Sequence, residues 1–221
     1  MNRPWTCLAA ASLAIATLFP PARPAAAAPL YDWGRADVRT YEDPAGDTRH
    51  GRGPYIACLD IVSARHAFDG TYHYFRIDLA VEPSMGDIPE ELKRQYYDAR
   101  YGIYVNSGPD GARDTDRYVP QIPWIDLREN RIDAILDAKL GDWNHKFRYW
   151  NGTDFTGTTD LAFQRTGATL EWKVKADFGA DFTWHAATML PGQGPHKKTF
   201  DHAYGNQPPI PAPGAVRLPG R

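Results

Sequence analysis

The chain has 221 residues, with 25 Lys and Arg against 27 Asp and Glu. This length is enough for one domain with a substantial core, and the small negative charge excludes the strongly basic composition that favours nucleic acid or anionic membranes. Aromatic residues make up 13% of the chain and Gly and Pro occur 19 times each, a composition typical of short strands joined by turns.

Residues 1–28 are predicted to be a secretory signal peptide. Arg3 supplies positive charge, residues 8–19 form an apolar run too short to span a bilayer, and residues 25–28 are four alanines that suit cleavage. No later run is long and apolar enough for a membrane helix, so we expect a secreted protein, extracellular or periplasmic. Cys58 is the only cysteine outside this peptide, which excludes a disulfide framework.

The first half of the remaining chain predicts strands before a short helix. The expected elements are an edge strand at 30–40, a turn at 43–47, and strands at 57–65 and 71–81. The last of these is the clearest, because apolar and polar side chains alternate along it. Asp87 is a good helix N-cap, and we expect a helix of two to three turns within residues 87–100.

The second half predicts further strands and a proline-rich end. The expected strands lie at 101–106, 143–150 and 182–190, with an irregular or edge strand at 117–127. Residues 131–140 leave helix and strand open, because their apolar spacing is nearly helical while their neighbours favour strands. Residues 206–221 are expected to form a disordered, proline-rich tail.

A hairpin within residues 160–175 gives the most specific local prediction. If Thr166–Gly167 is a two-residue loop, Phe163 pairs with Leu170 and Leu161 with Trp172. The apolar side chains then share one face, and a shift of one residue would destroy this arrangement. We therefore expect Trp172 in the core.

These elements together predict an all-β fold. Many short strands separated by turn residues are typical of an antiparallel two-sheet β-sandwich, of jelly-roll or immunoglobulin-like type, here with one short helical insertion. We expect a single domain over residues 29–205, with no internal repeat.

The first acidic segment is a candidate calcium site. Asp43 and Asp47 lie four residues apart on a turn that contains Pro44 and Gly46, and Asp60 lies near the start of the following strand. Calcium takes six to eight oxygen ligands from carboxylates, backbone carbonyls and water. We expect these three aspartates to hold it. The alternative is an Asp-Pro turn whose side chains cap their own backbone.

A second acidic loop follows residue 106. It carries Asp110, Asp114 and Asp116, which are further candidate metal ligands. Their spacing differs from the alternating acids of an EF-hand loop. A solvated loop is the alternative.

Three groups of motifs occur within residues 31–190. They are YEDPAGD at 41–47 followed by LDI at 59–61, YGIYVN at 101–106 followed by a Gly- and Asp-bearing loop, and LEWKV at 170–174. They resemble the β-sandwich modules related to the C-terminal domain of glucodextranase, with DOMON and family-nine carbohydrate-binding modules as broader relatives. The resemblance implies an antiparallel sandwich, often stabilised by calcium, that binds glycans or, in some DOMON members, haem.

Glycan binding would use exposed aromatic side chains as flat platforms for sugar rings. The candidates are Trp124, Trp143, Tyr149, Trp150 and Trp184. The alternative is that these rings lie in the core, where large aromatic side chains contribute most of their stabilisation. Trp150 is the best candidate, because it precedes the turn-forming pair Asn151–Gly152.

We therefore expect a secreted, non-catalytic carbohydrate-binding module, stabilised by calcium, whose partner is a polysaccharide or cell-wall glycan. Three alternatives remain open: a secreted carbohydrate-active enzyme or accessory subunit, a haem-binding DOMON-type redox module, and a surface protein whose sandwich is a scaffold. Haem would need axial ligands such as Met189 and His185. The sequence has no G-x-S-x-G, H-E-x-x-H or phosphate-loop motif, which disfavours catalysis.

Overall fold

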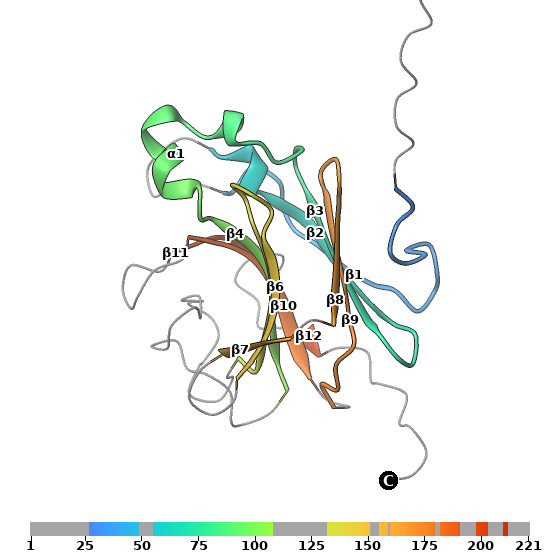
Figure 1. Cartoon of the computed structure of the whole chain (residues 1–221). Coiled ribbons are helices and arrows are strands. Elements are labelled where there is room, and N and C mark those ends of the chain that lie inside the picture. The colour runs from blue at the N-terminus through green and yellow to red at the C-terminus, as the bar shows by residue number, and fades with distance from the viewer. Residues whose placement is uncertain are drawn as a thin grey trace, which may run out of the picture.

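The protein is a two-sheet β-sandwich, as predicted (Figure 1). The computed structural model describes residues 27–48, 55–107, 132–150, 155–158, 160–179, 182–190, 198–202 and 210–211. Within these residues the chain forms two antiparallel sheets and one α-helix.

The first sheet has five strands in the order β1-β2-β3-β9-β8, and all neighbours in it are antiparallel. Its strands are β1 (Arg39–Glu42), β2 (Ile61–Phe68), β3 (His73–Leu79), β8 (Leu161–Thr166) and β9 (Thr169–Val174). Because β9 pairs with β3, the chain leaves this sheet after β3 and returns to it much later. Segments far apart in the sequence are therefore held together by main-chain hydrogen bonds.

The second sheet has seven strands, in the order β11-β10-β4-β5-β6-β7 with β12 also paired to β10. Its strands are β4 (Arg100–Asn106), β5 (Ala134–Lys139), β6 (His145–Trp150), β7 (Phe155–Thr158), β10 (Thr183–Leu190), β11 (Lys198–His202) and β12 (Ile210–Pro211). Strand β5 decides the ambiguous segment 131–140 in favour of a strand. Strand β12 lies within the proline-rich range 206–221 and pairs with Thr183 and Trp184.

The main core lies between the two sheets. The alternation predicted for β3 places Phe75, Ile77 and Leu79 in this core. Burying such apolar side chains is the main source of stability in a sandwich. Trp172 and Trp184 are the largest fully buried side chains of the described residues, so the prediction for Trp172 is confirmed.

The β8–β9 hairpin has a different register from the predicted one. Phe163 pairs with Trp172, two residues beyond the predicted partner Leu170, so Gly167 and Ala168 form the loop. Gly167 has a φ of 57°, which suits the first central position of a type II′ turn. Since side chains alternate with a period of two, this shift keeps the apolar residues on one face.

The helical insertion has about two turns, the lower end of the predicted length. Helix α1 covers Glu90–Tyr96, with Pro89 at its N-cap position. Asp87 is not the N-cap, because it belongs to a 3₁₀ helix, η2 (Met85–Asp87), that is capped by Ser84. Within the described part of the chain, no helix has the length and apolar character needed to cross a membrane.

The strand predicted for residues 57–65 starts later than expected. Ala57–Leu59 form a 3₁₀ helix, η1, and β2 begins at Ile61. The Tyr101 hydroxyl, from the seven-stranded sheet, donates a hydrogen bond to the Cys58 carbonyl at 2.5 Å. This bond helps to hold η1 against the opposite sheet.

The segment before β1 packs over the outer face of the five-stranded sheet. Residues 30–38 form turns instead of the predicted edge strand. Trp33 packs with Tyr74 in a small apolar cluster. The Glu171 carboxylate accepts hydrogen bonds from the Leu30 amide, at 3.0 Å, and from the Trp33 indole. A buried carboxylate therefore anchors this segment.

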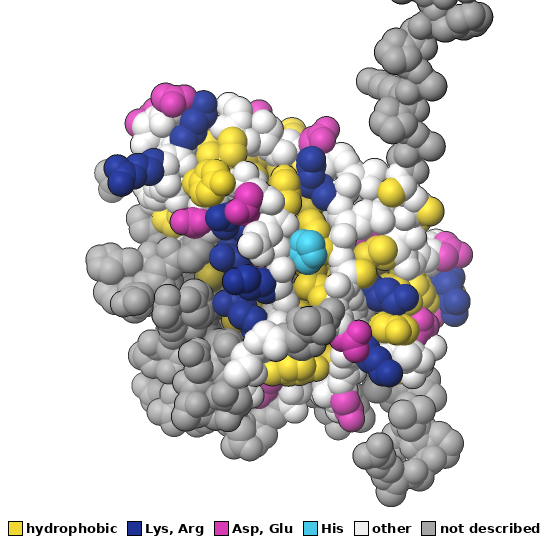
Figure 2. Space-filling model, viewed as in Figure 1, with side chains coloured by type: hydrophobic (Ala, Val, Ile, Leu, Met, Phe, Trp, Pro, Cys, Tyr) yellow, Lys and Arg dark blue, Asp and Glu magenta, His cyan; other side chains and the backbone are white. Residues whose placement is uncertain are grey.

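The outer face of the seven-stranded sheet has an apolar part and a charged part. The apolar part contains Tyr104, Ile132, Ile135, Ala187 and Met189. In the charged part, Arg100 and Arg148 both pair with the buried Asp137, and Lys139 pairs with Asp98 and Asp142. Figure 2 shows a row of Lys and Arg side chains in front of β4 and β6. The ion pairs with Asp98, Asp137 and Asp142 offset part of this positive charge.

Candidate functional site

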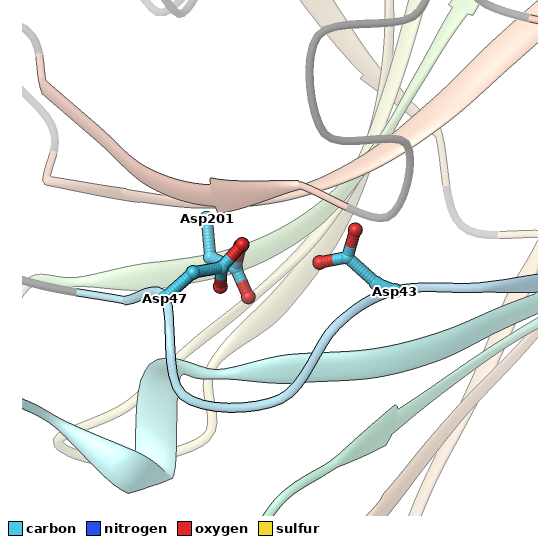
Figure 3. Close-up of side chains that lie close together, drawn as sticks. All are labelled: Asp43, Asp47 and Asp201. Atoms are coloured by element: carbon cyan, nitrogen blue, oxygen red, sulfur yellow. The ribbon is translucent and has the colours of Figure 1, made fainter.

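Three aspartate side chains converge where the edges of the two sheets meet. Asp43 directly follows β1, Asp47 ends the turn after it, and Asp201 lies in β11 (Figure 3). One carboxylate oxygen from each of the three lies within 4.8 Å of the others. Since β1 and β11 are edge strands of different sheets, the cluster contains residues from both sheets. We call these three residues the aspartate cluster.

Local sequence explains how the turn presents its two carboxylates. Gly46 has a φ of 96°, a conformation that glycine adopts without strain, and it reverses the chain between Asp43 and Asp47. The Asp43 amide donates to the Val62 carbonyl at 3.0 Å, which extends the pairing of β1 with β2 by one bond. The turn therefore starts from a fixed position on the five-stranded sheet.

Asp60, the third predicted ligand, lies beside the aspartate cluster instead of in it. Its fully buried carboxylate accepts hydrogen bonds from the Gly46 amide at 2.8 Å, the Thr48 hydroxyl at 3.0 Å and the Tyr55 hydroxyl. These bonds hold the C-terminal part of the acidic turn and the residues that follow it. Asp60 is therefore a positioning residue for the turn, and the third converging carboxylate belongs to Asp201.

Asp201 is held by both sheets. It pairs with Thr188 of β10 in the seven-stranded sheet, and its buried carboxylate accepts a hydrogen bond from the Ile61 amide at the start of β2. The Thr188 hydroxyl in turn donates to the Leu59 carbonyl at 3.0 Å. The position of Asp201 relative to the turn is thus fixed by contacts between the sheets.

The aspartate cluster and the neighbouring Asp60 bring several negatively charged carboxylates close together. The pKa of Asp47 is raised, first because neighbouring atoms remove part of the water from its otherwise exposed carboxylate and second because of the charge of Asp60 beside it. The pKa of Tyr55 is also raised, by burial and by its hydrogen bond to Asp60. A cation at this position would offset the repulsion and favour the charged forms of the carboxylates.

Sequence reasoning missed Asp201, and no local signal could have found it. The residue lies in a segment where no strand was predicted, and only the pairing of β11 with β10 places it next to the turn. Asp110, Asp114 and Asp116 of the second acidic loop lie outside the described residues, so their candidacy stays a prediction.

Two of the predicted aromatic platforms are not freely accessible: the prediction for Trp184 is wrong, and Trp143 is only partly accessible. Trp184 has 0% of its surface exposed and packs against Tyr41 in the core, so it offers no ring face to a ligand. Trp143 is half-buried, and its ring stacks on both Tyr101 and Phe163, with centroid distances of 5.7 and 6.3 Å. Neighbouring side chains therefore already occupy much of the Trp143 ring.

Two of the remaining platform candidates, Tyr149 and Trp150, lie on β6. Tyr149 is half-buried and makes an edge contact with Phe147 at 4.5 Å. Trp150 is half-buried and packs against the apolar part of the outer face of the seven-stranded sheet. Trp124 lies outside the described residues. Tyr149 and Trp150 thus keep part of their surface for a ligand.

The two residues considered for haem ligation lie on the same strand. His185 and Met189 are both buried in β10. The Tyr104 ring stacks on His185 at 5.2 Å, and its hydroxyl donates to the Met189 sulfur at 3.6 Å. Both side chains therefore already have a partner in Tyr104.

Comparison with known proteins finds no matching family model, no matching curated protein and no matching solved structure. The motif resemblance to carbohydrate-binding sandwich modules stays a prediction.

Proposed function

We propose that the protein is a secreted β-sandwich module, stabilised by calcium, that binds carbohydrate without catalysing a reaction. The observation that supports this best is the convergence of Asp43, Asp47 and Asp201 within 4.8 Å at the junction of the two sheets. Three carboxylates at this separation repel one another strongly unless a cation or protons accompany them.

The chemistry of the aspartate cluster favours calcium. All three side chains offer oxygen, which hard cations prefer, and calcium accepts irregular sets of six to eight oxygen ligands. Asp43 and Asp201 are buried while Asp47 is exposed, so water can complete the shell from the side of Asp47. Magnesium demands a near-ideal octahedron and retains more of its water, so it suits this site less well.

The ion would have a structural role. It would connect the turn after β1 to strand β11, and hence one sheet to the other. An ion that binds only the folded state adds about 2.7 kcal/mol of stability when its free concentration is about 100 times Kd. For a domain of this size that corresponds to a melting temperature higher by roughly 5–10 °C.

Asp201→Asn tests the calcium site. Asparagine keeps an oxygen acceptor for the Ile61 amide but removes one of the clustered charges. We expect calcium to raise the melting temperature of the native protein over that in chelator, and to have little effect on the variant. In chelator the variant should be at least as stable as the native protein, because its cluster carries less repulsion.

Asp177→Asn is the matched control. Asp177 is exposed, and its carboxylate accepts a hydrogen bond from the Gly179 amide that asparagine can also accept. Its calcium response should equal that of the native protein. Equal melting temperatures of the native protein in calcium and in chelator, measured by scanning calorimetry, would refute the calcium site.

The carbohydrate part of the proposal rests on the motif resemblance and on the partly exposed aromatic side chains of β6. Retention of the protein on insoluble polysaccharides, and retardation in gels that contain soluble ones, measure this binding directly. We expect retention without release of reducing sugar. Release of reducing sugar would instead indicate a carbohydrate-active enzyme, and absence of retention on every polysaccharide would remove the carbohydrate part.

A further inference from the structure

A shallow depression of about 510 Å³ lies beside α1. Its lining residues are Met85, Lys93, Arg94, Tyr97 and Asp98. Tyr97 follows the last residue of the helix and is 45% exposed, more than any other large hydrophobic side chain among the described residues. Figure 2 shows an apolar patch over the region of α1, bordered by basic and acidic side chains.

The Tyr97 ring is held in place by the turn after β5. A Cβ atom on Gly141 would come within 2.6 Å of two ring carbons of Tyr97, so only glycine lets the ring lie so close to this backbone. The Gly141 amide also donates to the Tyr97 carbonyl at 3.1 Å. The ammonium group of Lys139 lies 4.6 Å from the ring centroid and adds a cation–π contact. The ring is therefore fixed before any ligand arrives.

Both hydrogen-bond donors and hydrogen-bond acceptors surround the Tyr97 ring. Asp98 offers carboxylate oxygens and is oriented by an ion pair with Lys139 at 3.1 Å. Lys93 pairs with Glu90 at 2.6 Å, while Arg94 makes no ion pair with another described residue and keeps its donors for a ligand. An exposed aromatic ring with neighbouring donors and acceptors, in a shallow depression, suits a ligand that packs one face against the surface and keeps the other in water.

The charges around the depression favour a neutral ligand. Three basic side chains (Lys93, Arg94 and Lys139) are matched by three acidic ones (Glu90, Asp98 and Asp142). A uronic-acid polymer would therefore gain little from electrostatic attraction here. A glucose ring carries its hydroxyls equatorially, so its two faces present C–H groups that pack well on an aromatic ring.

We propose that this depression is a carbohydrate subsite in which Tyr97 is the stacking platform for one glucosyl unit of a neutral β-linked glucan. Arg94 and Asp98 would hydrogen-bond the sugar hydroxyls. This inference rests on the proposed function, because it names the place and the sugar class of the carbohydrate binding. The Tyr97 ring can contact a ligand because it is exposed and held in place, whereas the Trp184 ring is buried.

Titration calorimetry with cellohexaose, a soluble β-linked glucose hexasaccharide, tests the subsite. Tyr97→Ala should weaken binding by about tenfold or more, because the stacked ring is lost. Tyr97→Phe should retain most of the affinity, because stacking uses the ring face and not the hydroxyl. Val81→Ala is the matched control, since Val81 is also exposed and apolar but does not line the depression. Its affinity should be unchanged.

The possible outcomes separate this inference from the proposed function. If the native protein binds the hexasaccharide and Tyr97→Ala binds it equally well, the subsite is refuted while carbohydrate binding stands. If the native protein binds polygalacturonate but not the hexasaccharide, the subsite is likewise refuted while carbohydrate binding stands. If no glycan binds the native protein, the subsite and the carbohydrate part of the proposed function both fail, while the calcium site is tested separately. Far-ultraviolet circular dichroism of each variant, together with retained binding by Tyr97→Phe, separates loss of the platform from loss of the fold.

Discussion

His66 and His73 form a buried pair within the sandwich. Their ring nitrogens Nε2 and Nδ1 lie 3.1 Å apart, so one ring donates a hydrogen bond to the other. Phe75 packs on His66 at 4.8 Å and Phe178 on His73 at 4.8 Å. Burial lowers the pKa of His66 to about 3 and that of His73 to about 4, because the charged ring loses its water. Both rings are therefore neutral in the folded protein.

Stability should fall when these histidines are driven toward their charged form. In the unfolded chain their pKa is about 6.5, so below that pH the unfolded state binds more protons than the folded state. The contribution of the pair to the free energy of unfolding should be constant above about pH 7 and fall between about pH 6.5 and 4, by up to about 2.7 kcal/mol per pH unit. Urea denaturation at a series of pH values measures this.

The double variant His66→Leu with His73→Leu should lose most of that slope, whatever its absolute stability. His145→Gln is the control, since His145 is exposed and its loss should leave the slope unchanged. A double variant with the native slope would contradict the assignment of the slope to this pair.

At the level of elements, the β8–β9 hairpin shows which local feature decides register. Gly167 has a positive φ and no atom within 4 Å of where a Cβ would lie, so its requirement is backbone conformation and not space. The two-residue loop starts where this conformation is needed, one residue later than predicted. The apolar alternation alone could not decide between the two registers, because both satisfy it.

Gly167→Ala should therefore lower the free energy of unfolding by about 1 kcal/mol, the usual cost of a left-handed conformation with a Cβ. Gly157→Ala is the matched control. Gly157 lies in β7 with a negative φ, and a Cβ there would meet only a backbone oxygen at 3.9 Å. The free energy of unfolding of the Gly157→Ala variant, measured by chemical denaturation, should differ from that of the native protein by less than about 0.5 kcal/mol. Equal effects of the two substitutions would argue against conformational strain at Gly167.

At the level of the whole molecule, the aspartate cluster lies between two edge strands that belong to different sheets. Strands β1 and β11 each have one neighbour in their own sheet, so they contribute the least main-chain pairing to it. A cation held by Asp43, Asp47 and Asp201 would connect these edges directly. The centre of the seven-stranded sheet, at β4 and β5, does not depend on such a contact.

Hydrogen exchange measured by mass spectrometry should reveal this division. On removal of calcium, the amides of β1 and β11 should exchange faster, while those of β4 and β5 keep their protection, because local opening requires only the loss of edge contacts. Asp201→Asn in calcium should resemble the native protein in chelator. Uniform acceleration over all strands, or no change at β1 and β11, would contradict a local role for the ion.

Sequence patterns predicted the class of fold and two of the three residues of the aspartate cluster. Alternating side chains in segments such as 71–81 require a sheet with one buried face, and Asp43 and Asp47 come together because one short turn carries both. Only the tertiary structure decided that Asp201 joins them, that Asp60 supports the turn from behind, and that Trp184 is buried while Tyr97 is exposed. The physical reason is range: periodicity and turn chemistry act over a few neighbouring residues, whereas these four placements follow from how two sheets pack against each other.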